Sequence, residues 1–188
     1  MTPSDAEIDA RASAVRLVLF DVDGVLTDGR VRIHADGSES KDFAIRDGIA
    51  MVWAQRAGIR VGFLSARSSA TTPHRAAQLG ITLVYHGVSS KLATYERILS
   101  DLGLTDRDVA YMGDDVVDLA VLARVGLSAA PADAVAEVQS RVHVVTRAAG
   151  GAGAARELLE RLLRAQGLWD GVVESYLSEP SAAGSATA

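Results

Sequence analysis

The chain has 188 residues, 48% of them apolar and 23% charged, a balance typical of one globular domain with a hydrophobic core. A formal charge of −5 and the lack of any run of basic residues argue against a nucleic-acid-binding protein. The absence of cysteine excludes disulfides, thiolate metal sites and cysteine nucleophiles. The sequence has neither a secretory signal nor an apolar run of the about 20 residues that a membrane span needs, so we expect a soluble cytoplasmic protein.

Short apolar runs alternate with helical patterns along the chain, after a first helix predicted over 5–14. The apolar runs end at polar residues or glycines, as buried parallel strands do, and cover 17–20, 61–64, 81–85, 109–112, 127–129 and 142–145. The helical patterns cover 47–57, 69–79, 90–102, 115–125, 132–140 and 152–166. This alternation predicts an α/β fold, a Rossmann-like parallel sheet with helices on both faces.

The segment after the first strand breaks this alternation. Between Asp28 and Phe43, Val31 and Ile33 alternate with polar residues and 35–38 supplies a turn, which predicts an inserted β-hairpin. The chain leaves no room for a cap domain. We therefore expect a single domain over 1–177, followed by a disordered tail of small and polar residues over 178–188.

Acidic residues follow two of the strands, at the edge where open parallel sheets bind ligands. Asp21 and Asp23 come after the first strand, and Asp114 and Asp115 come after the fourth. Converging carboxylates repel one another unless a cation lies among them, and oxygen ligands without His or Cys suit Mg²⁺. Asp21 can attack phosphorus to form an aspartyl-phosphate, while Asp23 can protonate the leaving alcohol and then activate water.

Further polar residues at the same edge suit a phosphate. Ser65 and nearby backbone N–H groups, with Ala66 next in the chain, can hold phosphate oxygens, and Lys91 can place a charge on phosphate and nucleophile. An isolated Asp-x-Asp pair is common in solvated turns. The specific signal is the order of the elements, an apolar strand followed by DVDGVLTD, a strand ending in Ser, a lone Lys opening a helix, and GDDVVD.

These motifs resemble those of the haloacid dehalogenase superfamily of phosphatases. The matching residues are Asp21, Asp23, Gly24 and Thr27 for the first motif, Ser65 for the second, Lys91 for the third, and Gly113, Asp114 and Asp118 for the fourth. The resemblance implies Asp21 as nucleophile and Asp23 as general acid and base. It also implies Mg²⁺ held by the carboxylates of Asp21 and Asp114 and the backbone carbonyl of Asp23, with Asp115 and Asp118 near the metal or behind its ligands.

From about Val15 to Gly167 the chain is similar to small cap-less phosphatases of 3-deoxy-D-manno-octulosonate 8-phosphate and of sialic-acid 9-phosphates. The carrying stretches include DVDGVLTDG, RDG at 46–48, SAR at 65–67, LGI at 79–81 and GDDVVD. The resemblance implies an octulosonate 8-phosphate as substrate, with a nonulosonate 9-phosphate or another sugar phosphate as the alternative. It further implies a role in lipopolysaccharide biosynthesis, and a homotetramer whose hairpins pack together and whose subunits cover neighbouring sites.

Arginines are candidates to bind a substrate carboxylate, because the guanidinium fork meets both oxygens. The candidates are Arg46, Arg67, Arg147 and Arg156, with Arg67 favoured because it follows Ser65 closely, and Gly48 is expected to bind the substrate as well. Surface ion pairs explain any one of these arginines equally well.

Two other functions remain open. A receiver-like phosphoacceptor domain also uses an aspartate, a lysine and a hydroxyl, although its acceptor follows the third strand. A nucleotide-binding module is suggested faintly by the glycine-rich segment 150–153, which lacks the final glycine spacing and an acidic partner.

Overall fold

The computed structural model of the chain describes residues 3–178, so of the predicted tail only Ser178 is described. The helices are α1 (Asp5–Ala12), α2 (Ile45–Arg56), α3 (Thr71–Gln78), α4 (Lys91–Leu102), α5 (Leu119–Leu122), α6 (Ala136–Gln139), α7 (Ala154–Ala165) and α8 (Trp169–Leu177). Two 3₁₀ turns are η1 (Asp106–Asp108) and η2 (Val116–Asp118). The strands are β1 (Leu17–Phe20), β2 (Arg32–Ile33), β3 (Glu39–Ser40), β4 (Arg60–Leu64), β5 (Leu83–Tyr85), β6 (Val109–Met112), β7 (Leu127–Ala130) and β8 (Val144–Val145).

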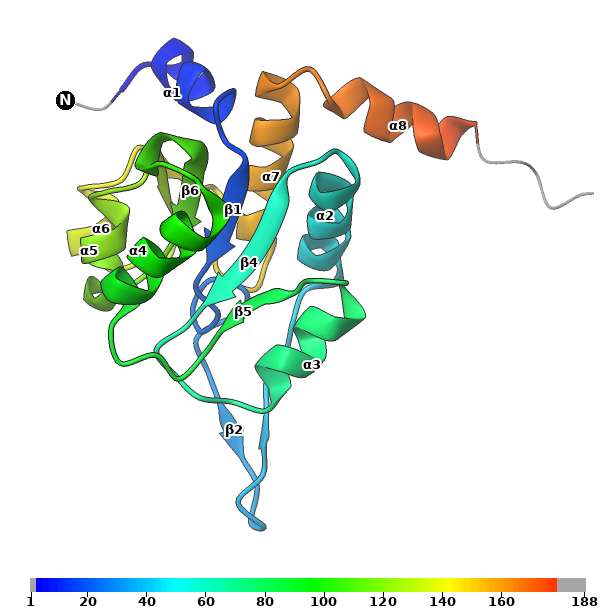
Figure 1. Ribbon diagram of the computed structural model, residues 1–188. Coiled ribbons are helices and arrows are strands. Elements are labelled where there is room, and N and C mark those ends of the chain that lie inside the picture. The colour runs from blue at the N-terminus through cyan, green and yellow to red at the C-terminus, as the bar shows by residue number, and fades with distance from the viewer. Residues whose placement is uncertain (1–2, 179–188) are drawn as a thin grey trace, which may run out of the picture.

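Six parallel strands form the main sheet in the order β5-β4-β1-β6-β7-β8, which confirms the predicted α/β fold (Figure 1). Strand β1 lies in the middle, with Leu17 opposite Arg60 on β4 and opposite Val109 on β6. The chain runs outward from β1 to β5 and then returns to the other side of β1. The strand order therefore reverses beside β1, where sheets of this type form a ligand crevice at their carboxyl edge.

Helices cover both faces of this sheet (Figure 1). Val18 and Phe20 belong to the core beneath α1, α2 and α7, whereas Leu17 and Leu19 belong to the core beneath α4 and α5. Successive residues of a strand point to opposite faces, so each face receives alternate side chains. Because both faces are buried, β1 is apolar throughout, which explains the unbroken run in the sequence.

The predicted hairpin is also present. Strands β2 and β3 pair antiparallel, with Arg32 opposite Ser40 and Ile33 opposite Glu39, and the hairpin projects away from the sheet beyond its carboxyl edge (Figure 1). Ile33 leaves 73% of its surface exposed. Within the described residues, no inserted domain covers the crevice. Among the same residues, none of the helices combines the length and apolar character that a membrane crossing requires.

Two predicted helices are shorter than their patterns indicated. The helix expected over 115–125 is reduced to the 3₁₀ turn η2 and the four residues of α5. The helix expected over 132–140 is limited to α6, because a turn after Pro131 places Asp133 so that its carboxylate accepts a hydrogen bond from the Gly150 N–H, 2.8 Å away. A side chain that bonds a distant backbone group in this way competes with helix formation.

Helix α8 was not predicted. Its apolar residues recur at helical spacing, and Trp169 and Tyr176 pack edge-on against Trp53 of α2, with ring centroids 5.8 and 6.0 Å apart. This aromatic cluster joins residues near both ends of α8 to α2.

Candidate active site

Three aspartates meet at the carboxyl edge between β1 and β6. Asp21 directly follows β1, and its N–H donates to the carbonyl of Met112, the last residue of β6. Carboxylate oxygens of Asp21, Asp114 and Asp118 lie within 4.8 Å of one another. The turn η2 brings Asp118 back to this point, because its Oδ2 accepts hydrogen bonds from the N–H groups of Asp114 and Asp115 at 3.1 and 3.3 Å.

Lys91 joins this group from α4. Ser90 caps the helix by accepting a hydrogen bond from the Ala93 N–H, so that Lys91 opens the first turn. The buried Lys91 ammonium lies 3.0 Å from Asp21 Oδ2 and 2.6 Å from Asp118 Oδ1. Sequence reasoning missed Tyr111, whose hydroxyl also donates to Asp118 Oδ1, because a tyrosine within an apolar strand carries no signal beyond packing.

Burial and mutual repulsion govern the protonation of these groups. Burial, followed by the charge of Asp118, raises the pKa of Asp21 to about 6 despite the opposing effect of Lys91. Burial and the charges of Asp21 and Asp118 raise the pKa of Asp114 to about 7. Burial lowers the pKa of Lys91, but the two aspartates beside it outweigh this effect and hold that pKa above its ordinary value. The carboxylates are thus under-compensated by the lysine alone.

The residues present fit a hard divalent cation. Asp21 Oδ1 and Asp114 Oδ1 are buried, and neither has a hydrogen-bond partner among residues 3–178. Gly24 has a φ of +87°, and a Cβ at this position would lie 2.0 Å from Asp114 Oδ2, so only glycine lets this loop approach Asp114. Clustered carboxylate oxygens without nitrogen or sulfur ligands suit Mg²⁺.

The predicted phosphate ligands lie at the end of β4, the strand beside β1. Ser65 is buried, and its hydroxyl accepts a hydrogen bond from the Arg67 N–H at 3.3 Å. Ala66 and Arg67 are exposed. Asp115 is exposed as well, and its carboxylate caps η2 by accepting from the Val116 N–H instead of joining the aspartate cluster.

Lys41, which sequence reasoning missed, connects the hairpin to the crevice. It follows β3, and its side chain has no exposed area. The ammonium lies 2.6 Å from Oδ1 and 2.9 Å from Oδ2 of Asp23. A second connection joins Glu39 on β3 to the loop after β4, where it accepts from the Arg67 guanidinium at 2.7 Å and from the Ser69 hydroxyl. The hydrogen bond to Glu39 is the main reason why the pKa of Arg67 is raised.

The other predicted substrate residues lie on or beside α2. Arg46 is exposed on the first turn, next to Gly153, where an added Cβ would lie 3.1 Å from Arg46 Cδ. Gly48 is buried and packs against Arg75 and Leu79, so its lack of a side chain serves close helix packing.

Two further candidate arginines are engaged elsewhere. Arg156 stacks over the ring of Trp53, 4.1 Å from its centroid, and pairs with Glu160. Arg147 pairs with Glu157 and is almost fully exposed. Among the four candidate arginines, Arg67 is the one that lies in the same loop as Ser65, so it stays the favoured candidate.

The glycine-rich segment before α7 packs against the loop that carries Asp21. A Cβ at Gly150 would lie 1.9 Å from the carbonyl oxygen of Gly24, and the N–H of Gly151 donates to Val25 at 3.0 Å. Asp47 of α2 completes this packing, because its Oδ1 accepts from the Arg156 N–H at the start of α7 at 2.8 Å. Close backbone packing thus accounts for these glycines without a nucleotide.

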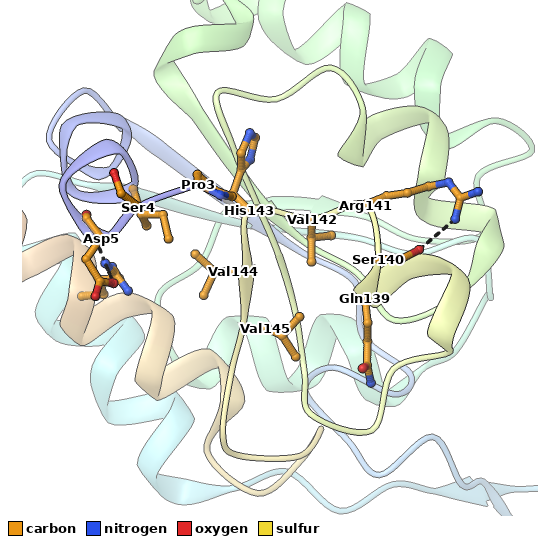
Figure 2. A pocket seen from close by; sticks show the side chains of 12 residues that line it. Pro3, Ser4, Asp5, Gln139, Ser140, Arg141, Val142, His143, Val144 and Val145 are labelled. Carbon is orange, nitrogen blue, oxygen red and sulfur yellow. Dashed lines mark hydrogen bonds and ion pairs between the residues drawn. The ribbon is translucent and has the colours of Figure 1, made fainter. Parts of the chain in front are cut away.

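A separate hollow of about 870 Å³ lies between the start of α1 and β8. Val144 and Val145 lie between Asp5 on one side and Gln139 and Arg141 on the other (Figure 2). None of the clustered aspartates lines this hollow, so its size does not make it the candidate site.

Three comparisons show which known proteins the chain is similar to. A model of the haloacid dehalogenase-like hydrolase family matches residues 75–158. The chain is 42% identical over 168 residues to a 3-deoxy-D-manno-octulosonate 8-phosphate phosphatase of Escherichia coli K12, and the aligned region covers 89% of each protein. A probable YrbI family phosphatase from Pseudomonas syringae superposes with a TM-score of 0.92 at 41% identity, over 94% of this chain and 100% of that one. A 3-deoxy-D-manno-octulosonate 8-phosphate phosphatase from Moraxella catarrhalis, solved with magnesium, phosphate and the sugar acid, gives 0.90 at 31% identity, over 92% and 99%.

Proposed function

The chain belongs to the haloacid dehalogenase-like hydrolases and is a phosphoric monoester hydrolase, and we propose that it removes the phosphate of 3-deoxy-D-manno-octulosonate 8-phosphate. The cluster of Asp21, Asp114, Asp118 and Lys91, buried except for the half-buried Asp114, carries the proposal for the chemistry. A cluster in which three carboxylates face one ammonium is electrostatically costly, and such clusters are typical of functional sites. The choice of substrate is supported by the relatives at 42% and 31% identity.

The reaction starts with the Asp21 carboxylate as nucleophile. It forms a bond to phosphorus as the bond from phosphorus to the sugar oxygen breaks, and Asp23 gives its proton to that oxygen. Asp23 then takes a proton from a water molecule as this water attacks the aspartyl-phosphate, which releases phosphate and restores Asp21. Lys91, paired with Asp21 at 3.0 Å, offsets the negative charge that gathers around phosphorus.

We propose that Asp21, Asp114 and the backbone of Asp23 hold Mg²⁺, with Asp118 behind them. The unpartnered oxygens of Asp21 and Asp114 support this assignment, and Asp118 is already engaged by Lys91 and Tyr111. When bound, Mg²⁺ supplies positive charge to the phosphate oxygens. Ser65 and the N–H of Ala66 are assigned to the phosphate, and Arg67 and Arg46, with Gly48 behind it, to the sugar acid.

We further propose that residues 1–177 form a single domain, which leaves the crevice open, and that the protein is a homotetramer in which neighbouring subunits cover the sites. The projecting hairpin, with its exposed Ile33, supports an interface there. Light scattering measures the assembly, and an Ile33→Asp variant should shift it to smaller species. A monomeric wild type with full activity would contradict this proposal.

Phosphate release from a panel of sugar phosphates tests the function. The panel includes the octulosonate 8-phosphate, a nonulosonate 9-phosphate and hexose phosphates, each measured with Mg²⁺ for wild type and Asp21→Asn. We expect a strong preference for the octulosonate ester and no turnover by the variant. Preference for another ester would overturn the substrate, whereas an active Asp21→Asn variant would overturn the nucleophile.

A further inference from the structure

The use of lysine in this chain is unusually restricted. Only two of the nineteen basic residues are lysines, Lys41 and Lys91, and all others are arginines. Both lysine side chains are buried, with exposed fractions of 0% and 4%. Each pairs with one of the two aspartates that follow β1, Lys91 with Asp21 and Lys41 with Asp23.

Arginine and lysine differ in shape, which gives this restriction a meaning. Arginine presents a wide planar fork, whereas lysine presents a compact point charge on a flexible stem. Since arginine serves at every other position, the two lysines stand where a small ammonium must fit beside a carboxylate in a confined space.

The contacts of Asp23 are few. Its carboxylate is 20% exposed at the crevice, and within residues 3–178 Lys41 is the one side chain that donates a hydrogen bond to it. Oδ2 accepts a hydrogen bond from the Lys41 ammonium at 2.9 Å, whereas Oδ1, 2.6 Å from the same nitrogen, has no hydrogen-bond partner among residues 3–178. The contact thus holds the carboxylate in place and leaves one oxygen to carry a proton. Without Lys41, Asp23 would be free to adopt other rotamers.

We propose that Lys41 is a positioning residue that holds the Asp23 carboxylate where it can exchange a proton with the leaving oxygen of the substrate. This inference rests on the proposed acid and base role of Asp23. Proton transfer requires hydrogen-bond distance and direction, so a carboxylate that rotates away loses most of its catalytic value. The hairpin that leads into Lys41 is then part of the catalytic apparatus.

A simpler role would be to anchor the hairpin. Glu39 already does so, through its contacts with Arg67 and Ser69. The two roles predict different results, since an anchor affects all substrates alike, whereas a group that positions an acid matters most for a poor leaving group.

Substituted phenyl phosphates separate these roles. From the 4-nitrophenyl ester to the unsubstituted one, the leaving group becomes poorer at nearly constant shape, and kcat/KM reports the steps up to release of the phenol. For Lys41→Met we expect kcat/KM to fall about 10²-fold with phenyl phosphate, which is within the range that general acids contribute. With 4-nitrophenyl phosphate, whose leaving group needs little protonation, we expect a fall of less than about threefold. Asp23→Asn should show the same steepened dependence.

Two further variants control for the fold. Glu39→Gln loosens the hairpin without touching Asp23 and should change kcat/KM for all the phenyl esters by one common factor. Lys41→Cys introduces the only thiol of the chain, so that treatment with 2-bromoethylamine restores an ammonium at this single position. The aminoethylated protein, verified by mass, should recover the shallow leaving-group dependence.

The positioning role of Lys41 would be overturned if Lys41→Met kept the wild-type dependence of kcat/KM on the leaving group while Asp23→Asn showed a steeper one. The proposed function would still stand. A wild-type dependence in Asp23→Asn would overturn the acid role itself. Neither result depends on which sugar phosphate is the natural substrate.

Discussion

Replacing Gly24 with alanine tests whether the close approach of the first loop to Asp114 builds the metal site. At Gly24 the backbone has a φ of +87°, and an added Cβ would lie 2.0 Å from Asp114 Oδ2. Gly58 offers a matched control, since its φ is +90° and nothing lies within 4 Å of the place where its Cβ would be. Both alanines meet the same backbone strain, and only one meets Asp114.

The two effects have different sizes and different targets. A positive φ costs a non-glycine residue about 1–3 kcal/mol, which should lower the stability of both variants similarly. In Gly24→Ala the contact must also widen from 2.0 Å to at least 3.0 Å, so the Asp114 carboxylate has to move by about 1 Å. Metal ligands tolerate deviations of only about 0.2 Å. Because loss of a mere supporting contact weakens metal binding about 10–100-fold, we expect at least about 100-fold weaker Mg²⁺ binding.

Calorimetric titration with Mg²⁺ measures this affinity, and the rate with 4-nitrophenyl phosphate and the Tm are recorded beside it. Gly58→Ala should bind Mg²⁺ as wild type does, at a lowered Tm. A second comparison places Gly24→Ala in an Asp114→Asn background, where the additional loss of affinity should be small because the ligand is already impaired. If Gly24→Ala binds Mg²⁺ as tightly as Gly58→Ala does, the close approach of this loop to Asp114 does not build the metal site.

Three other predictions concern protons, charge and the second layer of the site. Because folding raises the pKa of Asp21 to about 6 and that of Asp114 to about 7, the metal-free fold holds more protons than the unfolded chain above pH about 4. Its Tm should therefore fall as the pH rises to 7, and the rise in Tm caused by Mg²⁺ should be larger at pH 8 than at pH 5.5; equal rises would contradict this coupling. Lys91→Met leaves Asp21 and Asp118 buried without a countercharge, so the metal-free variant should lose about 3–5 kcal/mol in urea unfolding, and a loss below about 1 would refute the reasoning. Asp47→Ala removes the side chain that caps α7, and a loss of about 1–2 kcal/mol in the same assay is expected, whereas an unchanged midpoint would show that the cap contributes nothing.

The parts of the molecule that sequence reasoning located best are those where local pattern and burial agree. Strand β1 is found where the apolar run over 17–20 predicted it, because a strand with both faces buried must be apolar throughout. Asp21, Asp114 and Lys91 could be grouped from the sequence because parallel strands deliver their carboxyl ends to one edge. Their catalytic roles remain proposals.

Contacts between distant segments were not predictable in the same way. Lys41 reaches Asp23 only because the hairpin folds back toward the crevice, and the sequence pattern does not give the orientation of the hairpin relative to the sheet. The scarcity of lysine was the one available signal. The limits of α6 likewise depend on the bond from Gly150 to Asp133, and α8 depends on Trp53, more than 100 residues earlier in the chain.

The charges at the crevice support a divalent ion more directly than any single residue does. Asp21, Asp23, Asp114 and Asp118 contribute four negative charges when ionised, and Lys41 and Lys91 contribute two positive ones. The remaining two negative charges equal the charge of one Mg²⁺. Without a cation, the site reduces this excess by holding protons, as the raised pKa values of Asp21 and Asp114 indicate.

A phosphate monoester then brings two negative charges of its own. Since one lysine beside three carboxylates leaves no spare positive charge, the phosphate needs the cation in addition to Lys91 and the backbone N–H groups after Ser65. We therefore expect phosphate to bind measurably to the Mg²⁺-loaded protein and not to the metal-free one.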